Sequence, residues 1–82
     1  MDKIIIERIF IHNNFLCIKV PNVNYNYVYR SGMSVGWDAH LNVLFYNGRE
    51  TTNDNKINII IEAVLNEYGE SLIIDESTII EI

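Results

Sequence analysis

Residues 37–45 constrain the fold most strongly, because every second residue in this stretch is apolar. The apolar series consists of Trp37, Ala39, Leu41, Val43 and Phe45. A period of two is typical of a β-strand that turns one face toward a core. The sequence therefore predicts a central strand over residues 37–45.

A second strand is predicted over residues 23–30, where Tyr25, Tyr27 and Tyr29 share one parity. Residues 31–36 contain two glycines and fit a hairpin loop between the two strands. If the tyrosines pack against the helix that we predict to begin near Asn55, they belong to the core, with their hydroxyls at its edge. If they face solvent, they are interface anchors. The sequence leaves both orientations open.

Two further strands are predicted before this hairpin, over residues 3–11 and 15–20, because both stretches are rich in β-branched and aromatic side chains. The polar residues 12–14 separate them over a hairpin-sized gap, and Pro21 ends the second strand. The pair Asn47 and Gly48 ends the last strand of the series. Four strands in succession predict an antiparallel meander.

A helix is predicted from about Asn55, because six apolar residues there recur at helical spacing. This stripe consists of Ile57, Ile60, Ile61, Val64, Leu65 and Tyr68. Asn53 or Asp54 is expected to cap its start, and Gly69 its end, where glycine adopts the left-handed conformation without strain. Residues 72–74 and 78–82 are short β-branched runs, and at least one is expected to add a strand.

These elements predict the α+β class for a single domain of 82 residues, 49% of them hydrophobic. The expected architecture is an antiparallel meander of about five strands, with a single helix in the C-terminal half packed on one face. Such a sheet has a second face that must be polar, covered or paired with another chain.

Charge is divided unequally along the chain, whose net charge is −5. Residues 1–49 carry five basic and three acidic side chains, whereas residues 50–82 carry one basic and eight acidic ones. An acidic surface repels nucleic acid and anionic membranes and speeds association with a basic protein. The apolar runs are too short for a membrane span or a signal peptide, and Cys17 is the single cysteine, so we expect a cytoplasmic protein without an intramolecular disulfide.

The stretch from Gly32 to Gly36 matches the pattern G-x-S-x-G of serine hydrolases, with Asp38 and His40 close by. That motif requires a strand before it and a helix after it, whereas the residues that follow alternate as a strand. We therefore interpret it as a loop and predict that the chain is not an enzyme.

Metal and acid–base sites are also not expected. His12, His40, Cys17 and Asp38 lack the spacings of zinc sites. Glu62, Glu67 and Glu70 do not share one helix face well, which indicates a solvated surface. No glycine-rich loop precedes the helix, so the sequence predicts neither a phosphate-binding site nor a cofactor.

In its small size, its acidity and its richness in isoleucine and asparagine, the chain resembles the immunity proteins of bacterial contact-dependent and other polymorphic toxin systems. The resemblance implies a cognate toxin, often a nuclease, held through electrostatic complementarity without a cofactor or turnover. Carboxylates would then pair with Lys and Arg of the toxin, and tyrosines would act as anchors. The candidate partner-binding residues are Tyr25, Tyr27, Tyr29, Asp38, Glu62, Glu67, Asp75 and Glu76.

Two alternatives remain open from the sequence. The apolar residues 78–82 could form an edge strand that pairs with a second copy, which would make the chain a self-associating structural or regulatory module, such as a homodimer. The acidic C-terminal part could instead imitate DNA and inhibit a DNA-binding protein. Neither alternative involves direct binding of nucleic acid.

Overall fold

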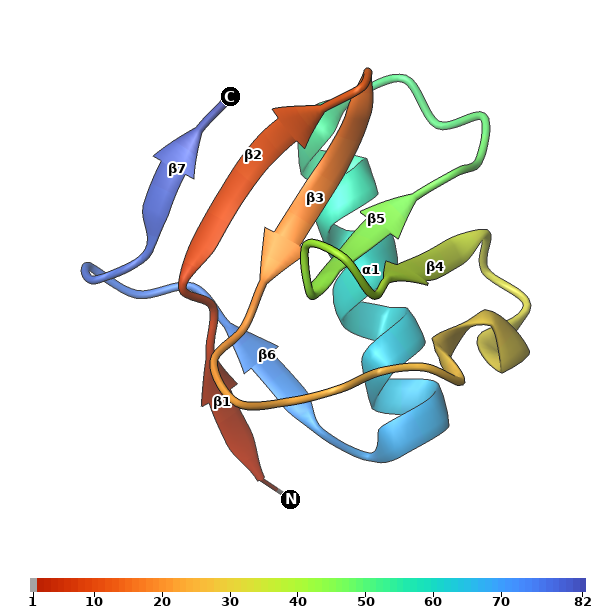
Figure 1. Ribbon diagram of the computed structural model, residues 1–82, viewed down its shortest axis with the longest axis horizontal. Helices are drawn as coiled ribbons and strands as arrows, with labels where there is room; N and C mark the ends of the chain where they lie inside the picture. The colour runs from red at the N-terminus through yellow and green to blue at the C-terminus, as the bar shows by residue number, and fades with distance from the viewer. Residues whose placement is uncertain (1) are drawn as a thin grey trace.

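The computed structural model describes residues 2–82 and belongs to the α+β class, as predicted (Figure 1). It contains one α-helix, one short 3-10 helix and seven short strands within these residues. The elements are β1 (Lys3–Ile5), β2 (Arg8–His12), β3 (Phe15–Lys19), η1 (Val28–Ser31), β4 (Val35–Asp38), β5 (Val43–Tyr46), α1 (Asn53–Tyr68), β6 (Ser71–Ile73) and β7 (Ile79–Glu81).

The main sheet has five strands in the order β4-β5-β3-β2-β7. Its first four strands are joined by antiparallel pairing, but β7 runs parallel to β2. Strands β1 and β6 form a separate parallel pair. The prediction of a purely antiparallel meander is therefore wrong, because the two C-terminal strands return after the helix to lie beside the N-terminal segment (Figure 1).

The strand predicted over residues 3–11 is divided in two at Ile6 and Glu7. The Ile6 N–H donates to the Ile73 carbonyl at 2.8 Å, whereas the Glu7 carbonyl accepts from the Ile79 N–H at 3.0 Å. The segment thus changes its partner from β6 to β7 between adjacent residues. Ile6, where the pairing partner changes, is fully buried, so this point of the chain lies in the hydrophobic core.

The hairpin predicted at residues 12–14 is confirmed. Asn13 and Asn14 lie between β2 and β3 with φ values of 51° and 69°. Asparagine tolerates this left-handed conformation better than most residues, and two such residues in succession match the twist of a tight hairpin.

The prediction of one continuous strand over residues 37–45 is wrong, because the chain reverses direction in its middle. Strands β4 and β5 form an antiparallel hairpin, with Trp37 opposite Leu44. The Asp38 carboxylate accepts hydrogen bonds from the backbone N–H groups of His40 at 2.9 Å and Leu41 at 3.1 Å, and so closes the turn. The sequence did not reveal this turn, because Ala39 and Leu41 continue the apolar period of two between the two strands.

The strand predicted over residues 23–30 is also wrong, because this stretch forms a turn that leads into η1. Tyr25 and Val28, three residues apart, are both fully buried, which fits a helical turn rather than a strand. Gly32 ends η1 in the left-handed conformation, with φ 72°. Residues 31–36 therefore connect η1 to β4 and are not the loop of a hairpin.

The predicted helix is confirmed as α1, although its start is capped by Thr52 and not by Asn53 or Asp54. The Thr52 side chain accepts from the Asn55 N–H at 3.2 Å. Gly69 ends the helix as predicted, with φ 68° and a hydrogen bond from its N–H to the Leu65 carbonyl at 2.9 Å.

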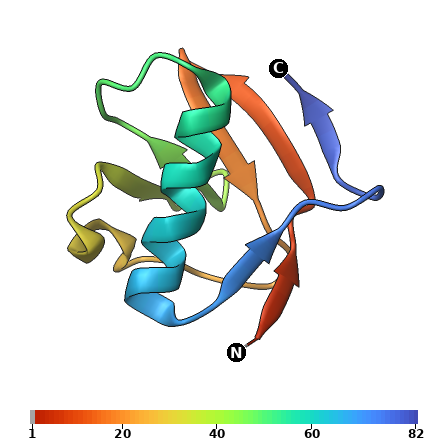
Figure 2. The same ribbon diagram turned by 180° about the vertical axis from the view of Figure 1, so that it is seen from behind.

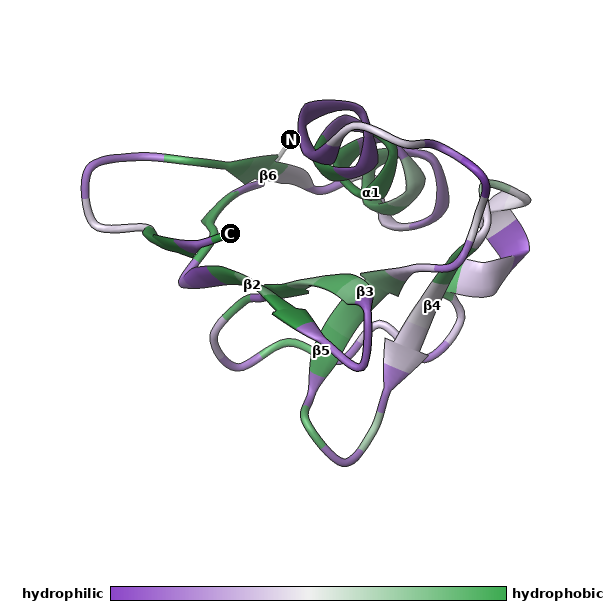
Figure 3. Ribbon diagram, turned by 90° about the horizontal axis from the view of Figure 1, so that it is seen from above, coloured by the Kyte–Doolittle hydropathy of each residue, from purple (hydrophilic) through white to green (hydrophobic). Residues whose placement is uncertain are grey.

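Helix α1 covers one face of the sheet, where hydrophobic residues of the strands lie (Figure 3). Ile57, Ile60 and Val64 of the predicted stripe are buried, together with Ala63, but Leu65 remains 36% exposed. Within residues 2–82, the backbone of α1 lies close to η1, β3, β4, β5 and β6 but not to β2 or β7. Figure 2 shows β7 at the side of the sheet that lies away from α1, and both of its isoleucines are exposed.

Candidate interaction surfaces

The turn before η1 is fixed to the core by Tyr25. The Tyr25 ring packs edge-on against the ring of Tyr68, at a centroid distance of 4.9 Å, and against Trp37, at 5.8 Å. Its hydroxyl donates to a Glu70 carboxylate oxygen at 2.8 Å. Burial, followed by this contact with Glu70, raises the pKa of Tyr25 well above its ordinary value. Tyr25 was predicted to bind a partner, but its side chain is fully buried. It therefore packs in the core beneath the exposed residues of this turn.

Backbone hydrogen bonds hold the same turn in place. The Val28 N–H donates to the Tyr25 carbonyl at 3.0 Å. The Tyr27 N–H donates to the Tyr68 hydroxyl at 2.8 Å, which ties the turn to the last residue of α1. The first hydrogen bond closes the turn on itself, and the second joins the turn to the C-terminal end of α1.

Three side chains project outward from this turn, and we call them the Tyr–Arg cluster: Tyr27, Tyr29 and Arg30. Tyr27 is 52% exposed and Tyr29 is 61% exposed, and their ring centroids lie 6.4 Å apart. The Arg30 guanidinium lies 4.3 Å from the centroid of the Tyr27 ring, within the range of cation–π attraction. A hydrogen bond with the Tyr29 side chain and the nearby carboxylate of Glu67 are among the contacts that raise the pKa of Arg30.

One acidic residue of α1, Glu67, lies near this cluster, since its charge acts on Arg30. Glu67 belongs to the last turns of the helix, and Glu62 is exposed on the same helix. The Asn66 side chain donates to the Met33 sulfur at 3.3 Å, which joins this part of α1 to the loop after η1. The predicted residues Tyr27, Tyr29, Glu62 and Glu67 therefore belong to two elements that pack against each other.

The remaining predicted carboxylates lie in two other turns. Asp38 caps the β4–β5 turn, and the backbone N–H groups of Leu41 and then His40 lower its pKa. Asp75 accepts from the Ser77 N–H at 2.8 Å in the β6–β7 connection, and Glu76 beside it is exposed. Figure 1 shows this connection at the opposite side of the molecule from η1. The structure thus brings together only part of the predicted set.

The segment that matches G-x-S-x-G lies between a 3-10 helix and a strand. Ser34 has a φ of 60°, and its carbonyl accepts from the Asn47 N–H at 2.8 Å, which fastens the start of the β4–β5 hairpin. A nucleophile elbow lies between a strand and a helix, and this segment does not have that context.

His12, Cys17 and Asp38 line one small hollow of about 120 Å³, together with the rings of Phe15 and Phe45. Cys17 is 3% exposed, and its thiol lies 3.5 Å from the Phe15 carbonyl. Burial, followed by the charge of Asp38, raises the pKa of the Cys17 thiol, which disfavours the reactive thiolate. Within residues 2–82, no group of three or more His, Cys, Asp or Glu residues is placed to hold a metal ion.

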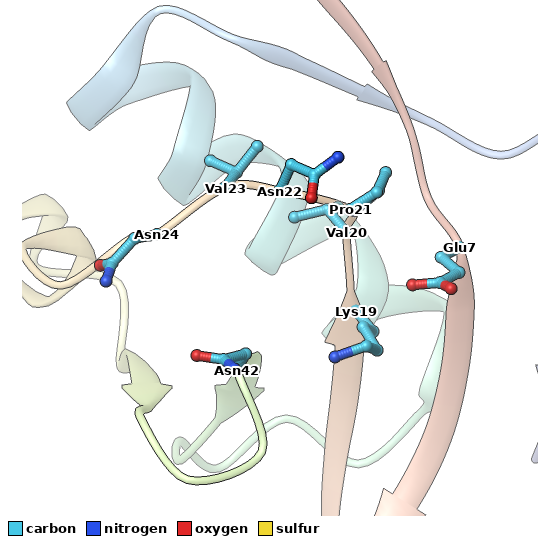
Figure 4. A pocket seen from close by; sticks show the side chains of 8 residues that line it. All are labelled: Glu7, Lys19, Val20, Pro21, Asn22, Val23, Asn24 and Asn42. Atoms are coloured by element: carbon cyan, nitrogen blue, oxygen red, sulfur yellow. The ribbon is translucent and has the colours of Figure 1, made fainter.

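A larger, open hollow of about 520 Å³ lies at the end of β3 (Figure 4). The Lys19 side chain points toward the loop that carries Asn42, and the Lys19 ammonium donates to the Leu41 carbonyl at 3.2 Å. The hollow is lined by Glu7, Lys19, Val20, Pro21, Asn22, Val23, Asn24 and Asn42. It combines both charges with amides and does not form an enclosed apolar site of the kind that binds small molecules.

A second exposed surface surrounds β7, and we call it the isoleucine edge: Ile11, Ile79, Ile80 and Ile82. These side chains are 46%, 55%, 54% and 49% exposed. Because Ile9 is level with Ile80 in the β2–β7 register, Ile11 is level with Ile82 and on the same face. The sequence predicts that residues 78–82 form an edge strand. It does not predict that Ile11 lies beside them, because the parallel pairing of β2 with β7 brings Ile11 to this edge.

Comparison of the chain with models of protein families, with curated proteins and with solved structures found no match. None of the helices within residues 2–82 combines the length and the apolar character needed to cross a membrane.

The sequence also did not identify Arg30 as a site residue. Its position at the end of the tyrosine row was a usable signal, because arginine and tyrosine are both enriched at interface hot spots.

Proposed function

We propose that this chain is a non-catalytic inhibitor that binds a basic protein, in the manner of an immunity protein that neutralises its cognate toxin. The Tyr–Arg cluster is the observation that carries the proposal. Tyr27 and Tyr29 are the large exposed aromatic side chains of a turn whose neighbours Tyr25 and Val28 are fully buried. Tyrosine and arginine contribute strongly to binding energy at protein interfaces. Since the turn is already ordered, binding costs little additional conformational entropy.

The charge of the neighbouring helix supports a basic partner. Glu67 lies on α1 near the cluster, Glu62 is exposed on the same helix, and the chain as a whole has a net charge of −5. Lys and Arg side chains of a partner would form charge-assisted hydrogen bonds with these carboxylates around the aromatic centre. The rate of association would then fall as salt is added, because screening weakens long-range attraction. In this proposal the protein acts in the cytoplasm and uses no cofactor.

The first experiment captures the partner. Wild-type chain, the double variant Tyr27→Ser/Tyr29→Ser and a control variant, Phe15→Ser, are immobilised and incubated with extract of the source cells. Phe15 is a suitable control because it is a 39% exposed aromatic residue on a strand away from η1. We expect a basic protein to be retained by wild type and by the control, and its retention to fall at least ~tenfold with the double variant.

The second experiment tests inhibition. The captured protein is expressed in a susceptible host together with wild type or the double variant, and growth is measured. We expect wild type to restore growth and the double variant to fail. Equal retention and equal protection by the double variant would contradict the proposal, provided that its circular dichroism spectrum matches that of wild type.

A further inference from the structure

Strand β7 is the last strand of the five-stranded sheet, so its outer edge has no neighbouring strand within residues 2–82. On its inner edge, the Ile79 N–H donates to the Glu7 carbonyl at 3.0 Å. Backbone groups alternate in direction along a strand, so the N–H and carbonyl of Ile80 point to the outer edge. Such unpaired backbone groups are a template for another strand.

The side chains around this edge are apolar and exposed. Ile80 is 54% exposed, whereas Ile9, beside it on β2, is completely buried. The hydrophobic core therefore includes Ile9 of β2 and stops before β7. Single exposed isoleucines are common, but here four of them surround one open strand.

The edge carries no net charge. Glu81 is the only charged residue of β7, and its carboxylate forms an ion pair with Arg8 of the adjacent strand. This ion pair offers a basic partner less electrostatic attraction than the carboxylate of Glu67 on α1, which lies near Arg30. In an antiparallel pair centred on Ile80, Glu81 of each copy would lie opposite Ile79 of the other, so no like charges face each other within the paired strands, although each chain carries a net charge of −5.

We propose that the isoleucine edge binds a second copy of this chain through antiparallel pairing of the two β7 strands. A two-fold axis at Ile80 would place Ile80 opposite its symmetry mate, where the two residues exchange N–H···O=C hydrogen bonds. Ile80, together with Ile11 and Ile82 on the same face, would then pack against the same residues of the second copy. The five-stranded sheets of the two copies would form one continuous sheet. This inference does not depend on the proposed function, because it uses a different surface.

The size of the edge predicts a weak dimer. A stable interface buries about 800 Å² of each partner. The chain exposes 5101 Å² in total, and only a three-residue strand with its neighbouring isoleucines contributes to this contact. We therefore expect a dissociation constant on the order of 10–100 μM, typical of a small, transient interface.

Sedimentation velocity over a range of protein concentrations tests the proposal. Wild type is compared with Ile80→Lys, which places a charge at the two-fold axis, and with Leu65→Lys as a matched control. Leu65 is an exposed apolar residue of α1, 36% exposed, outside the edge. We expect the mass of wild type and of the control to rise toward that of two chains, and Ile80→Lys to lower the association constant at least ~tenfold.

A second variant tests the backbone pairing itself. Ile80→Pro removes the N–H that points outward and leaves the hydrogen bonds between β7 and β2 intact, as proline is tolerated on an edge strand. We expect this variant to remain monomeric with an unchanged circular dichroism spectrum.

Hydrogen exchange on the wild-type chain gives a readout that needs no variant. We expect the Ile80 amide to exchange more slowly as protein concentration rises. A wild-type chain that stays monomeric up to about 1 mM would overturn the proposal, since this exceeds the expected dissociation constant tenfold. Association that survives Ile80→Pro, or that is lost equally with Leu65→Lys, would also overturn it.

Discussion

The two edges of the five-stranded sheet end in different ways. Strand β4 lies beside η1 and its ordered turn, and it carries Gly36 and the charged Asp38. Within residues 2–82, strand β7 has no covering element on its outer side, and two of its three residues are exposed isoleucines. Figure 1 shows these edges at opposite sides of the molecule.

This difference separates two kinds of recognition. At the β4 edge, η1 lies close to the strand, and its ordered turn presents the side chains of Tyr27, Tyr29 and Arg30 in a fixed arrangement. At the β7 edge, the outward backbone groups have no neighbouring strand within residues 2–82, and the exposed side chains are isoleucines apart from Glu81, which pairs with Arg8. The first arrangement suits a partner of complementary charge and shape, whereas the second suits a strand with the same pattern.

The largest expected effect concerns the residue that supports the covered edge. Tyr25→Ala should lower the free energy of unfolding by about 3–5 kcal/mol, because it removes a fully buried ring. Tyr29→Ala, at a 61% exposed position in the same turn, should change it by less than about 0.5 kcal/mol. Urea unfolding of both variants measures the contrast, and similar losses would show that the turn is not supported by Tyr25.

The next effect concerns the packing of β4. A Cβ atom at Gly36 would lie 2.5 Å from Cζ of the Phe45 ring, so this ring must move in Gly36→Ala. We expect a loss of about 1–3 kcal/mol in urea unfolding, the usual cost of overpacking. The control at the other edge is Ile79→Ala, which should cost under about 1 kcal/mol because Ile79 is 55% exposed. A larger loss for Ile79→Ala would contradict the contrast between the edges.

The pH dependence of stability provides a third comparison. Burial and the contact with Glu70 raise the pKa of Tyr25 in the folded state, so the folded chain holds this proton more tightly than the unfolded chain. The resulting stabilisation is fully present below the unfolded tyrosine pKa of about 10 and is lost as the pH rises above it.

Thermal unfolding between about pH 9 and pH 11 should therefore show a falling stability, with a slope of up to about 1.4 kcal/mol per pH unit for this proton. Tyr25→Phe should remove this contribution, and Tyr29→Phe should retain it. An unchanged slope in Tyr25→Phe would indicate that another group titrates.

The smallest effect is expected at the open edge. The side chains of Arg8 and Glu81 are 43% and 49% exposed, so water and salt screen their ion pair. Its contribution to the free energy of unfolding should be at most about 1 kcal/mol. A double-mutant cycle with Arg8→Ala and Glu81→Ala at low and high salt measures it. A coupling energy that does not decrease with salt would show that the pair is shielded from solvent.

The elements that could be predicted from the sequence are those determined by local spacing and by single special residues. The stripe of α1, its glycine C-cap at Gly69 and the Asn13–Asn14 hairpin depend on neighbours within one or two turns of chain. Residues 23–30 were predicted incorrectly because Tyr25 and Tyr27 fit a strand, whereas Tyr25 and Val28 fit a helical turn. Burial of Val28 decided between the two periods, and burial depends on the whole fold.

The pairing of strands and the grouping of site residues required contacts between distant parts of the chain. Residues 78–82 indicated an edge strand, but their parallel pairing with β2 is set by the path of the chain after α1. The exposure of Tyr27 and Tyr29, and the separation of Asp38, Asp75 and Glu76 from them, depend on the same long-range arrangement. The composition of the sequence indicated which types of residue could form an interface, but it did not indicate where in the fold these residues lie.

The central claim is that the Tyr–Arg cluster binds the partner while the isoleucine edge does not. Isothermal titration calorimetry of the captured basic partner against wild type, Tyr27→Ser/Tyr29→Ser and Ile80→Lys tests it directly. We predict that the double variant weakens binding at least ~tenfold and that Ile80→Lys binds like wild type. Undiminished binding by the double variant, or an equal loss with Ile80→Lys, would contradict it.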